Sequence, residues 1–287
     1  MKLENFVLFS LAPVSRASRA LLYGFLFVFA AGVFSACGEY NKVLKSEDPA
    51  YKYEKAVEYY NDGRCMQALP IFEDLIGMVR GTQLAEGVYY HYAQCHYCIG
   101  DYYLANYYFN NFTKTFVYSG YAEECQFLAA MCSYNLSPQQ SLDQTDTRLA
   151  INEMQLFMDR YPNSAKRDTC NLLITELNQK LELKSFEIAR LYEKTQHYKS
   201  AVLALNSAIK EYPNSPYKEE MLFLIVRANY LYANRSVVEM KLERFNNTIE
   251  SYYNFVAYFP ESKFLKEAEG YFVNSRKEVE RLQKTAS

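Results

Sequence analysis

Apolar residues recur at three- and four-residue spacing along most of the chain from Tyr51 onward. This is the period at which one face of an α-helix is buried. The pattern breaks at Gly63 and at Gly100, and the same period resumes directly after each break. Glycine at such a break is typical of a tight turn. The pattern therefore predicts successive units, each made of a helix, a turn and a second helix.

The first two predicted units are also similar in sequence. When the sequence is aligned with itself at an offset of 37 positions, residues of the first unit match residues of the second; position 53, for example, aligns with position 90. Repetition at a fixed period of this size is typical of solenoid folds, in which each repeat packs on its neighbours. The matched pairs are Tyr53 and Tyr90, Ala56 and Ala93, Tyr60 and Tyr97, Gly63 and Gly100, Ala68 and Ala105, and Phe72 and Phe109.

A later unit resembles the tetratricopeptide repeat, with small residues where paired helices cross, aromatic residues between them and a closing proline. We predict an all-α fold, a tetratricopeptide-repeat solenoid of about five helix-turn-helix repeats over residues 50–287. The charge-rich stretch 266–284 is expected to form a C-terminal capping helix. The residues that carry the resemblance are Ala189, Tyr192, Ala201, Leu205, Ala208 and Pro213.

The N-terminus has the layout of a signal peptide, with basic residues before an apolar run over 20–34. That run of fifteen residues is shorter than the roughly 20 needed to cross a bilayer. Phe34-Ser35-Ala36-Cys37 then resembles the lipobox of bacterial lipoproteins. We predict a lipoprotein signal peptide over 1–36, lipidation at Cys37 and a lipidated tether over 37–49.

The resemblance to lipoproteins implies a covalent diacylglycerol and an N-acyl chain such as palmitate on Cys37, and no other cofactor is expected. Two or more acyl chains hold a protein on a membrane stably. Gly38 replaces the aspartate that favours inner-membrane retention, which indicates the periplasmic face of an outer membrane. The alternative is an ordinary secreted protein with an incidental cysteine.

The lipobox, the repeats and two nearly identical helix endings, Tyr161-Pro162-Asn163-Ser164 and Tyr212-Pro213-Asn214-Ser215, together resemble the BamD (YfiO) lipoproteins. That resemblance implies a scaffold of the outer-membrane β-barrel assembly complex. Its expected partners are a BamA-like barrel insertase, other assembly lipoproteins and unfolded outer-membrane proteins. Two alternatives stay open: a tetratricopeptide lipoprotein that pilots pilus or secretin assembly, and a lipid-anchored carbohydrate-uptake binding protein.

Partners of such solenoids bind along a concave face lined by the first helix of each repeat. Tyrosine suits this face because it offers a large contact area, little rotamer entropy and a hydroxyl group. The alternative is that these side chains pack between helices. The residues expected to form the partner-binding face are Tyr53, Val57, Tyr60, Tyr90, Gln94 and Tyr97.

The cysteines that follow Cys37 could form disulfides, pack as reduced thiols or bind a metal. Three disulfides are possible in an oxidising compartment, but cysteine also packs as a small apolar residue, and we expect mostly reduced thiols. His91, Cys95 and Cys98 share one helical face and would need a further ligand for a metal, so we predict no metal site. The six cysteines are Cys65, Cys95, Cys98, Cys125, Cys132 and Cys170.

The charge balance weighs against nucleic-acid binding, and the absence of common catalytic motifs weighs against an enzyme. With 31 basic and 33 acidic residues, the chain lacks the positive excess that attracts nucleic acid. It has three histidines and none of the glycine loops, nucleophile elbows or paired metal-binding histidines of common enzymes. We therefore predict a binding protein without catalytic residues.

Overall fold

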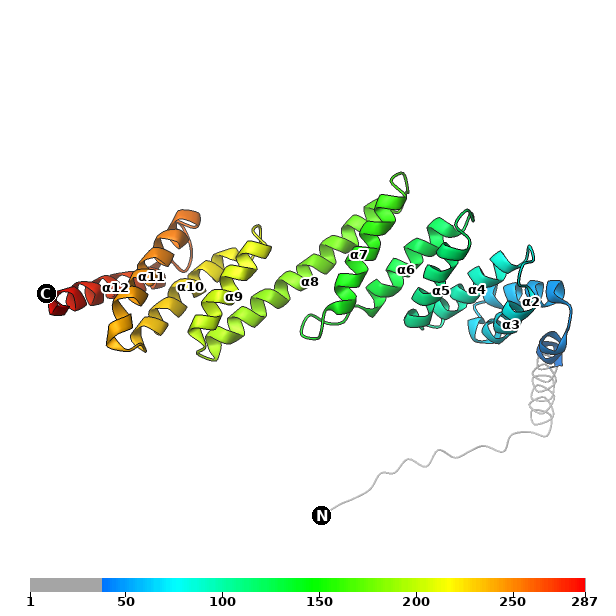
Figure 1. Ribbon diagram of the computed structural model, residues 1–287, viewed down its shortest axis with the longest axis horizontal. Helices are drawn as coiled ribbons and strands as arrows, with labels where there is room; N and C mark the ends of the chain where they lie inside the picture. The colour runs from blue at the N-terminus through cyan, green and yellow to red at the C-terminus, as the bar shows by residue number, and fades with distance from the viewer. Residues whose placement is uncertain (1–37, 287) are drawn as a thin grey trace, which may run out of the picture. The chain divides into compact units, whose positions relative to one another are not determined.

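The computed structural model describes residues 38–286, and there every regular element is a helix (Figure 1). No strand occurs in this range, which confirms the prediction of an all-α fold. The predicted signal peptide and Cys37 lie outside the described residues. The helices that follow residue 48 are α2 Pro49–Asn61, α3 Cys65–Met78, α4 Ala85–Cys98, α5 Tyr102–Thr115, α6 Ala122–Leu136, α7 Thr145–Arg160, α8 Arg167–Lys194, α9 Tyr198–Glu211, α10 Lys218–Asn234, α11 Val238–Tyr258 and α12 Leu265–Ala286.

The chain divides into two compact units, with the boundary inside α6 at Ala129. In the first unit α2 packs on α3 and α4, and α4 packs on α3 and α5. Ala56 and Ala93, the small residues predicted at the helix crossings, are fully buried. Alanine at these positions lets the helix axes approach closely.

The turns between paired helices form where the sequence predicts them. Gly63 and Gly100 have φ angles of +74° and +79°, in the left-handed region that side chains with a Cβ rarely adopt. The backbone N–H of Gly63 donates to the carbonyl of Tyr60, and that of Gly100 donates to the carbonyl of Tyr97. Glycine therefore ends the first helix of both repeats in the same way.

The second unit has α10 at its centre, packed on α8, α9, α11 and α12. Residues 221–226 of this helix are all apolar and all buried, so neighbouring helices cover every side of α10 along this stretch. Helix α12, where the capping helix is predicted, packs on α10 and α11 and buries Ala268. The unit is thus a stack of helical hairpins, as in tetratricopeptide repeats.

The recurring proline endings position the helix that follows each of them. Ser164 Oγ accepts a hydrogen bond from the backbone N–H of Lys166 (3.1 Å), and Ser215 Oγ accepts one from Tyr217 (3.0 Å). Ser262 Oγ accepts the equivalent bond from Phe264 (3.1 Å). These bonds satisfy backbone amides that precede the first helical turn.

The segment expected to be a polar tether is structured in the part that the structure describes. Residues 38–45 are helical, and Val43 is fully buried in the core of the first unit. The sequence contains Tyr40, Val43 and Leu44 among polar residues, and all three contact that core. This short amphipathic pattern is too brief to stand out from a polar linker, and tertiary packing stabilises it.

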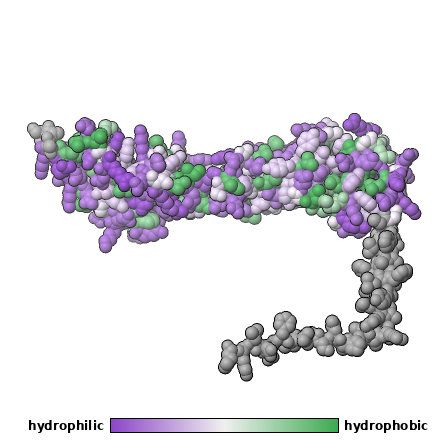
Figure 2. Space-filling view, turned by 90° about the horizontal axis from the view of Figure 1, so that it is seen from below, coloured by the Kyte–Doolittle hydropathy of each residue, from purple (hydrophilic) through white to green (hydrophobic). Residues whose placement is uncertain are grey.

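The described surface is mostly hydrophilic. Figure 2 shows hydrophobic residues interspersed among hydrophilic ones on the visible face. Between residues 38 and 286 no helix combines the length and the apolar character that crossing a bilayer requires.

Candidate functional site

The predicted partner-binding residues lie on α2 and α4, the first helices of the first two repeats, which contact each other. Five of the six side chains are half-buried, and Gln94 is 7% exposed. Val57 packs against the core of the first unit, and the ring of Tyr97 contacts Tyr102 and Phe109 of its own hairpin. The other four residues make polar contacts between repeats: the Tyr53 hydroxyl lies 3.4 Å from His91 Nδ1, and the contacts of Tyr60, Tyr90 and Gln94 are described below.

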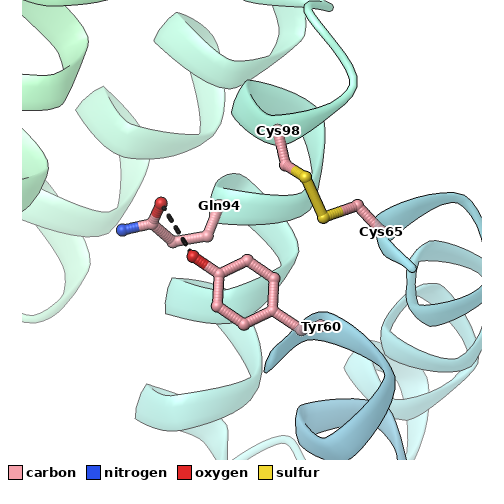
Figure 3. Close-up of a disulfide and its surroundings, with 4 residues drawn as sticks. All are labelled: Tyr60, Cys65, Gln94 and Cys98. Carbon is pink, nitrogen blue, oxygen red and sulfur yellow. Dashed lines mark hydrogen bonds between the residues drawn. A yellow bond between two sulfur atoms is a disulfide. The ribbon is translucent and has the colours of Figure 1, made fainter. Parts of the chain in front are cut away.

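A chain of hydrogen bonds runs across this surface from α2 to α6. The Tyr60 hydroxyl donates to Gln94 Oε1 (3.4 Å), and Gln94 Nε2 donates to the Tyr90 hydroxyl (2.8 Å). The Tyr90 hydroxyl in turn donates to Glu124 Oε2 (3.0 Å). Figure 3 shows Tyr60 directed towards Gln94. We call these four residues the polar ladder; it links side chains of α2, α4 and α6, the first helices of three successive repeats.

An aromatic cluster around His91 lies beside the polar ladder. The His91 ring stacks on Phe72 (5.6 Å between centroids), and the rings of Tyr53 and Tyr60 meet it edge-on. His91 Nδ1 lies 2.8 Å from the carbonyl oxygen of Gly87, to which its N–H donates. We name His91, Phe72, Tyr53 and Tyr60 the aromatic cluster. Phe72 is fully buried beneath it, and the half-buried rings of the other three lie next to hydroxyl groups.

Burial determines the protonation of these groups. It raises the pKa of Tyr53 and Tyr60, and burial followed by the charge of Glu124 raises the pKa of Tyr90. The phenols therefore stay protonated and able to donate hydrogen bonds at neutral pH. Tyr60 and Tyr90 already donate their hydroxyl protons within the polar ladder, so this surface suits the main-chain N–H groups and apolar side chains of an extended peptide better than a charged ligand.

Sequence reasoning missed three residues of this surface. His91 was weighed only as a metal ligand, and Glu124 was not expected in the partner-binding face. Tyr121 stacks on Tyr90, with 4.2 Å between ring centroids. Their partners on neighbouring helices lie between 19 and 38 positions away in sequence, so no local spacing relates them.

The cysteines divide into one disulfide and four reduced thiols. Cys65 and Cys98 form a disulfide, with Cα atoms 6.3 Å apart (Figure 3). We expected mostly reduced thiols, and these two residues differ from that expectation. They can form the bond because the turns of repeats one and two bring the start of α3 and the end of α4 together. Cys98 is thus unavailable as a metal ligand, and within the described range no three His, Cys, Asp or Glu residues are grouped to hold an ion. The reduced thiols, all buried, are Cys95, Cys125, Cys132 and Cys170.

Gly87→Ala is expected to destabilise the first unit by about 1–3 kcal/mol, because the added methyl group overpacks the α2–α4 contact. A Cβ atom there would lie 2.9 Å from Cζ of Tyr53, whose ring is held against Phe72 and His91. Urea unfolding monitored by circular dichroism measures the loss. Gly77→Ala in α3 is the matched control, since nothing lies within 4 Å of its Cβ position. Equal stability of the two variants would contradict the prediction.

Acidification below about pH 6.5 is expected to destabilise the first unit through His91 and His96. Burial lowers the pKa of both imidazoles in the folded protein. Both groups are neutral above the unfolded pKa, and below it the unfolded chain binds more protons, so stability falls as pH falls. Thermal melts at about pH 7.5 and about pH 5.5 should show a smaller drop for His91→Gln than for the unchanged protein. An identical drop would exclude His91 as a contributor.

Comparison with known proteins agrees with this architecture. The family model described as YfiO, outer membrane lipoprotein, matches residues 45–242. The match extends through the first unit and through most of the second, up to the early part of α11. No curated protein matches the chain. Since the matched region is more than half of the 287 residues, the chain belongs to the YfiO family of outer membrane lipoproteins.

Proposed function

We propose that this protein is a lipid-anchored scaffold subunit of the outer-membrane β-barrel assembly complex, exposed to the periplasm. The observation that carries the proposal is the YfiO match over residues 45–242, which includes parts of both helical units. The protein binds a BamA-like insertase together with other assembly lipoproteins, and it receives unfolded barrel proteins. Its role is binding and positioning, without catalysis.

The first unit supplies the surface for unfolded substrates. The aromatic cluster and the polar ladder together present ring faces and protonated hydroxyl groups on α2 and α4. Segments of barrel proteins that are rich in aromatic residues complement such a surface, because stacked and edge-on rings add to the burial of apolar area. Extended peptides also bring unpaired main-chain N–H groups, which can donate to the Tyr60 hydroxyl oxygen while its own proton stays bonded to Gln94.

Membrane attachment depends on Cys37. Its diacylglycerol and N-acyl chains hold the protein on the periplasmic leaflet of the outer membrane, since multiple acyl chains together give stable anchoring. No further cofactor is needed for the proposed role.

The test of partner identity is a mild-detergent purification of the tagged protein from membranes, beside a Cys37→Ala form. We expect the barrel insertase to be recovered with the unchanged protein from the outer-membrane fraction, and to be lost with Cys37→Ala. Recovery of a secretin would favour the piloting alternative, and recovery of a sugar transporter would favour carbohydrate uptake. Either result would overturn the assembly proposal.

The test of substrate binding is photo-crosslinking to an unfolded barrel protein. Tyr60→Ala combined with Gln94→Ala is expected to weaken capture about tenfold or more, as removal of a buried aromatic contact typically does. Tyr103→Ala is the matched control, because this tyrosine is exposed on α5, away from the polar ladder. Equal capture by both variants would show that substrates bind elsewhere.

A further inference from the structure

The chain is firmly packed from the first residues that the structure describes. The Tyr40 hydroxyl donates to the Gln67 carbonyl of α3 (3.2 Å), and its ring meets Tyr59 of α2 edge-on at 5.7 Å. Lys55 Nζ lies 3.2 Å from Glu39 Oε1. Together with the buried Val43, these contacts fix the 38–45 helix on the first unit.

Order continues into α2 without a flexible joint. Ser46 Oγ accepts a hydrogen bond from the backbone N–H of Asp48 (3.2 Å). The Asp48 carboxylate accepts one from Ala50 (2.9 Å) and caps α2. In sequence, only Gly38 separates Cys37 from Glu39, the first residue with a contact to the folded unit, and one residue spans about 3.8 Å. A lipid on Cys37 therefore has almost no slack before the folded unit begins.

The edge of the first unit nearest to Gly38 has the chemistry of a membrane interface. Tyr40 contacts the start of α3, where Met66 is 72% exposed. Arg64 lies over the ring of Tyr59, 4.4 Å from its centroid. Tyr59 is buried, but Tyr40 is half-buried and Arg64 is exposed. Tyrosine and arginine favour the headgroup region, because each combines an apolar body with a polar end, and an exposed methionine gains by leaving water.

A hollow and paired charges complete this edge. The hollow, of about 470 Å³, lies between the α2–α3 turn and the end of α4, and Met66 and Ile99 are among the residues that line it. Two of the nearby carboxylates have a cationic partner: Asp62 is paired with Arg64, and Glu39 shares Lys55 with Glu58. Paired carboxylates do not repel lipid phosphates as free ones would.

We propose that this edge of the first unit, formed by the 38–45 helix, the α2–α3 turn and the end of α4, lies directly on the phospholipid bilayer. We call it the membrane edge. The acyl chains on Cys37 then hold the first repeat at the headgroups instead of at the end of a flexible tether. The inference rests on the proposed lipidation of Cys37, and the phospholipid surface is the partner to which it commits.

The test uses the lipidated full-length protein in vesicles of phosphatidylethanolamine and phosphatidylglycerol that contain a headgroup-level spin-labelled lipid. An environment-sensitive fluorescent amino acid replaces Met66 in one sample and Gln83 in another. Gln83 is the matched control, because it is exposed in the turn at the opposite end of α3. That helix has 14 residues and is about 21 Å long. We expect at least threefold stronger quenching at position 66 than at position 83.

The outcomes separate the membrane edge from the anchor itself. A protein that floats with the vesicles but shows equal quenching at both positions would overturn the membrane edge and leave the anchor in place. A protein that does not float would instead overturn lipidation at Cys37. A spacer of about twelve glycine and serine residues after Cys37 adds a mean reach of about 20 Å. It is expected to lower quenching at position 66 without affecting flotation, and unchanged quenching would contradict the role of the direct link.

Discussion

Loss of the Cys65–Cys98 disulfide is expected to lower the free energy of unfolding of the first unit by about 3–4 kcal/mol. The bond joins residues 33 positions apart, so it closes a loop of intermediate length in the unfolded chain. Restricting that loop lowers the entropy of the unfolded state, and the restriction disappears when the bond is removed. The bond also links α3 of the first repeat to α4 of the second. These are the two repeats that carry the aromatic cluster.

The measurement is urea unfolding of the unchanged protein and of the Cys65→Ala, Cys98→Ala double variant, each with and without reductant. Reductant is expected to destabilise only the unchanged protein. The buried thiols of Cys95 and Cys125 have pKa values raised by burial to about 12, so they do not exchange with the disulfide at neutral pH. A double variant as stable as the oxidised protein would contradict the prediction.

Glu193→Ala is expected to destabilise the second unit by about 3–5 kcal/mol. Both carboxylate oxygens of Glu193 accept hydrogen bonds from the Arg227 guanidinium, from Nε (2.8 Å) and Nη2 (2.9 Å). The Glu193 side chain is only 7% exposed, and the pair joins α8 to α10 at the centre of the unit. The Arg227 side chain is itself 29% exposed, so the main cost of the change is the loss of two charge-assisted hydrogen bonds to a buried carboxylate.

The control for this prediction is Glu187→Ala, which removes a similar pair in a more exposed position. Glu187 accepts a hydrogen bond from Arg190 (2.7 Å), but its side chain is 42% exposed. Exposed pairs typically contribute between zero and about 1 kcal/mol. Thermal and urea melts of both variants give the comparison. If Glu193→Ala is as stable as Glu187→Ala, the prediction is contradicted. Water would then stabilise the Arg227 guanidinium as effectively as the Glu193 carboxylate does.

The fold could be predicted from the sequence because its signals are local. Helical periodicity, glycine at 63 and 100, and serine after the proline endings each act within a few residues. The small residues that repeat at Ala56 and Ala93 mark helix crossings in the same local way. The repeat therefore specifies its own hairpin, and stacking follows because each hairpin leaves an apolar face to bury.

The polar ladder, the disulfide and the helical start of the described chain depended on tertiary structure. Six cysteines allow 15 pairings, and no spacing selects Cys65 with Cys98 until the turns of two repeats lie side by side. Tyr90 and Glu124 likewise meet only when successive first helices stack. The 38–45 helix is too short to be stable alone, and the core that buries Val43 stabilises it. The local sequence pattern thus determined the hairpins. The candidate site and the membrane edge depend instead on contacts between residues that are distant in sequence and meet only when the helices pack.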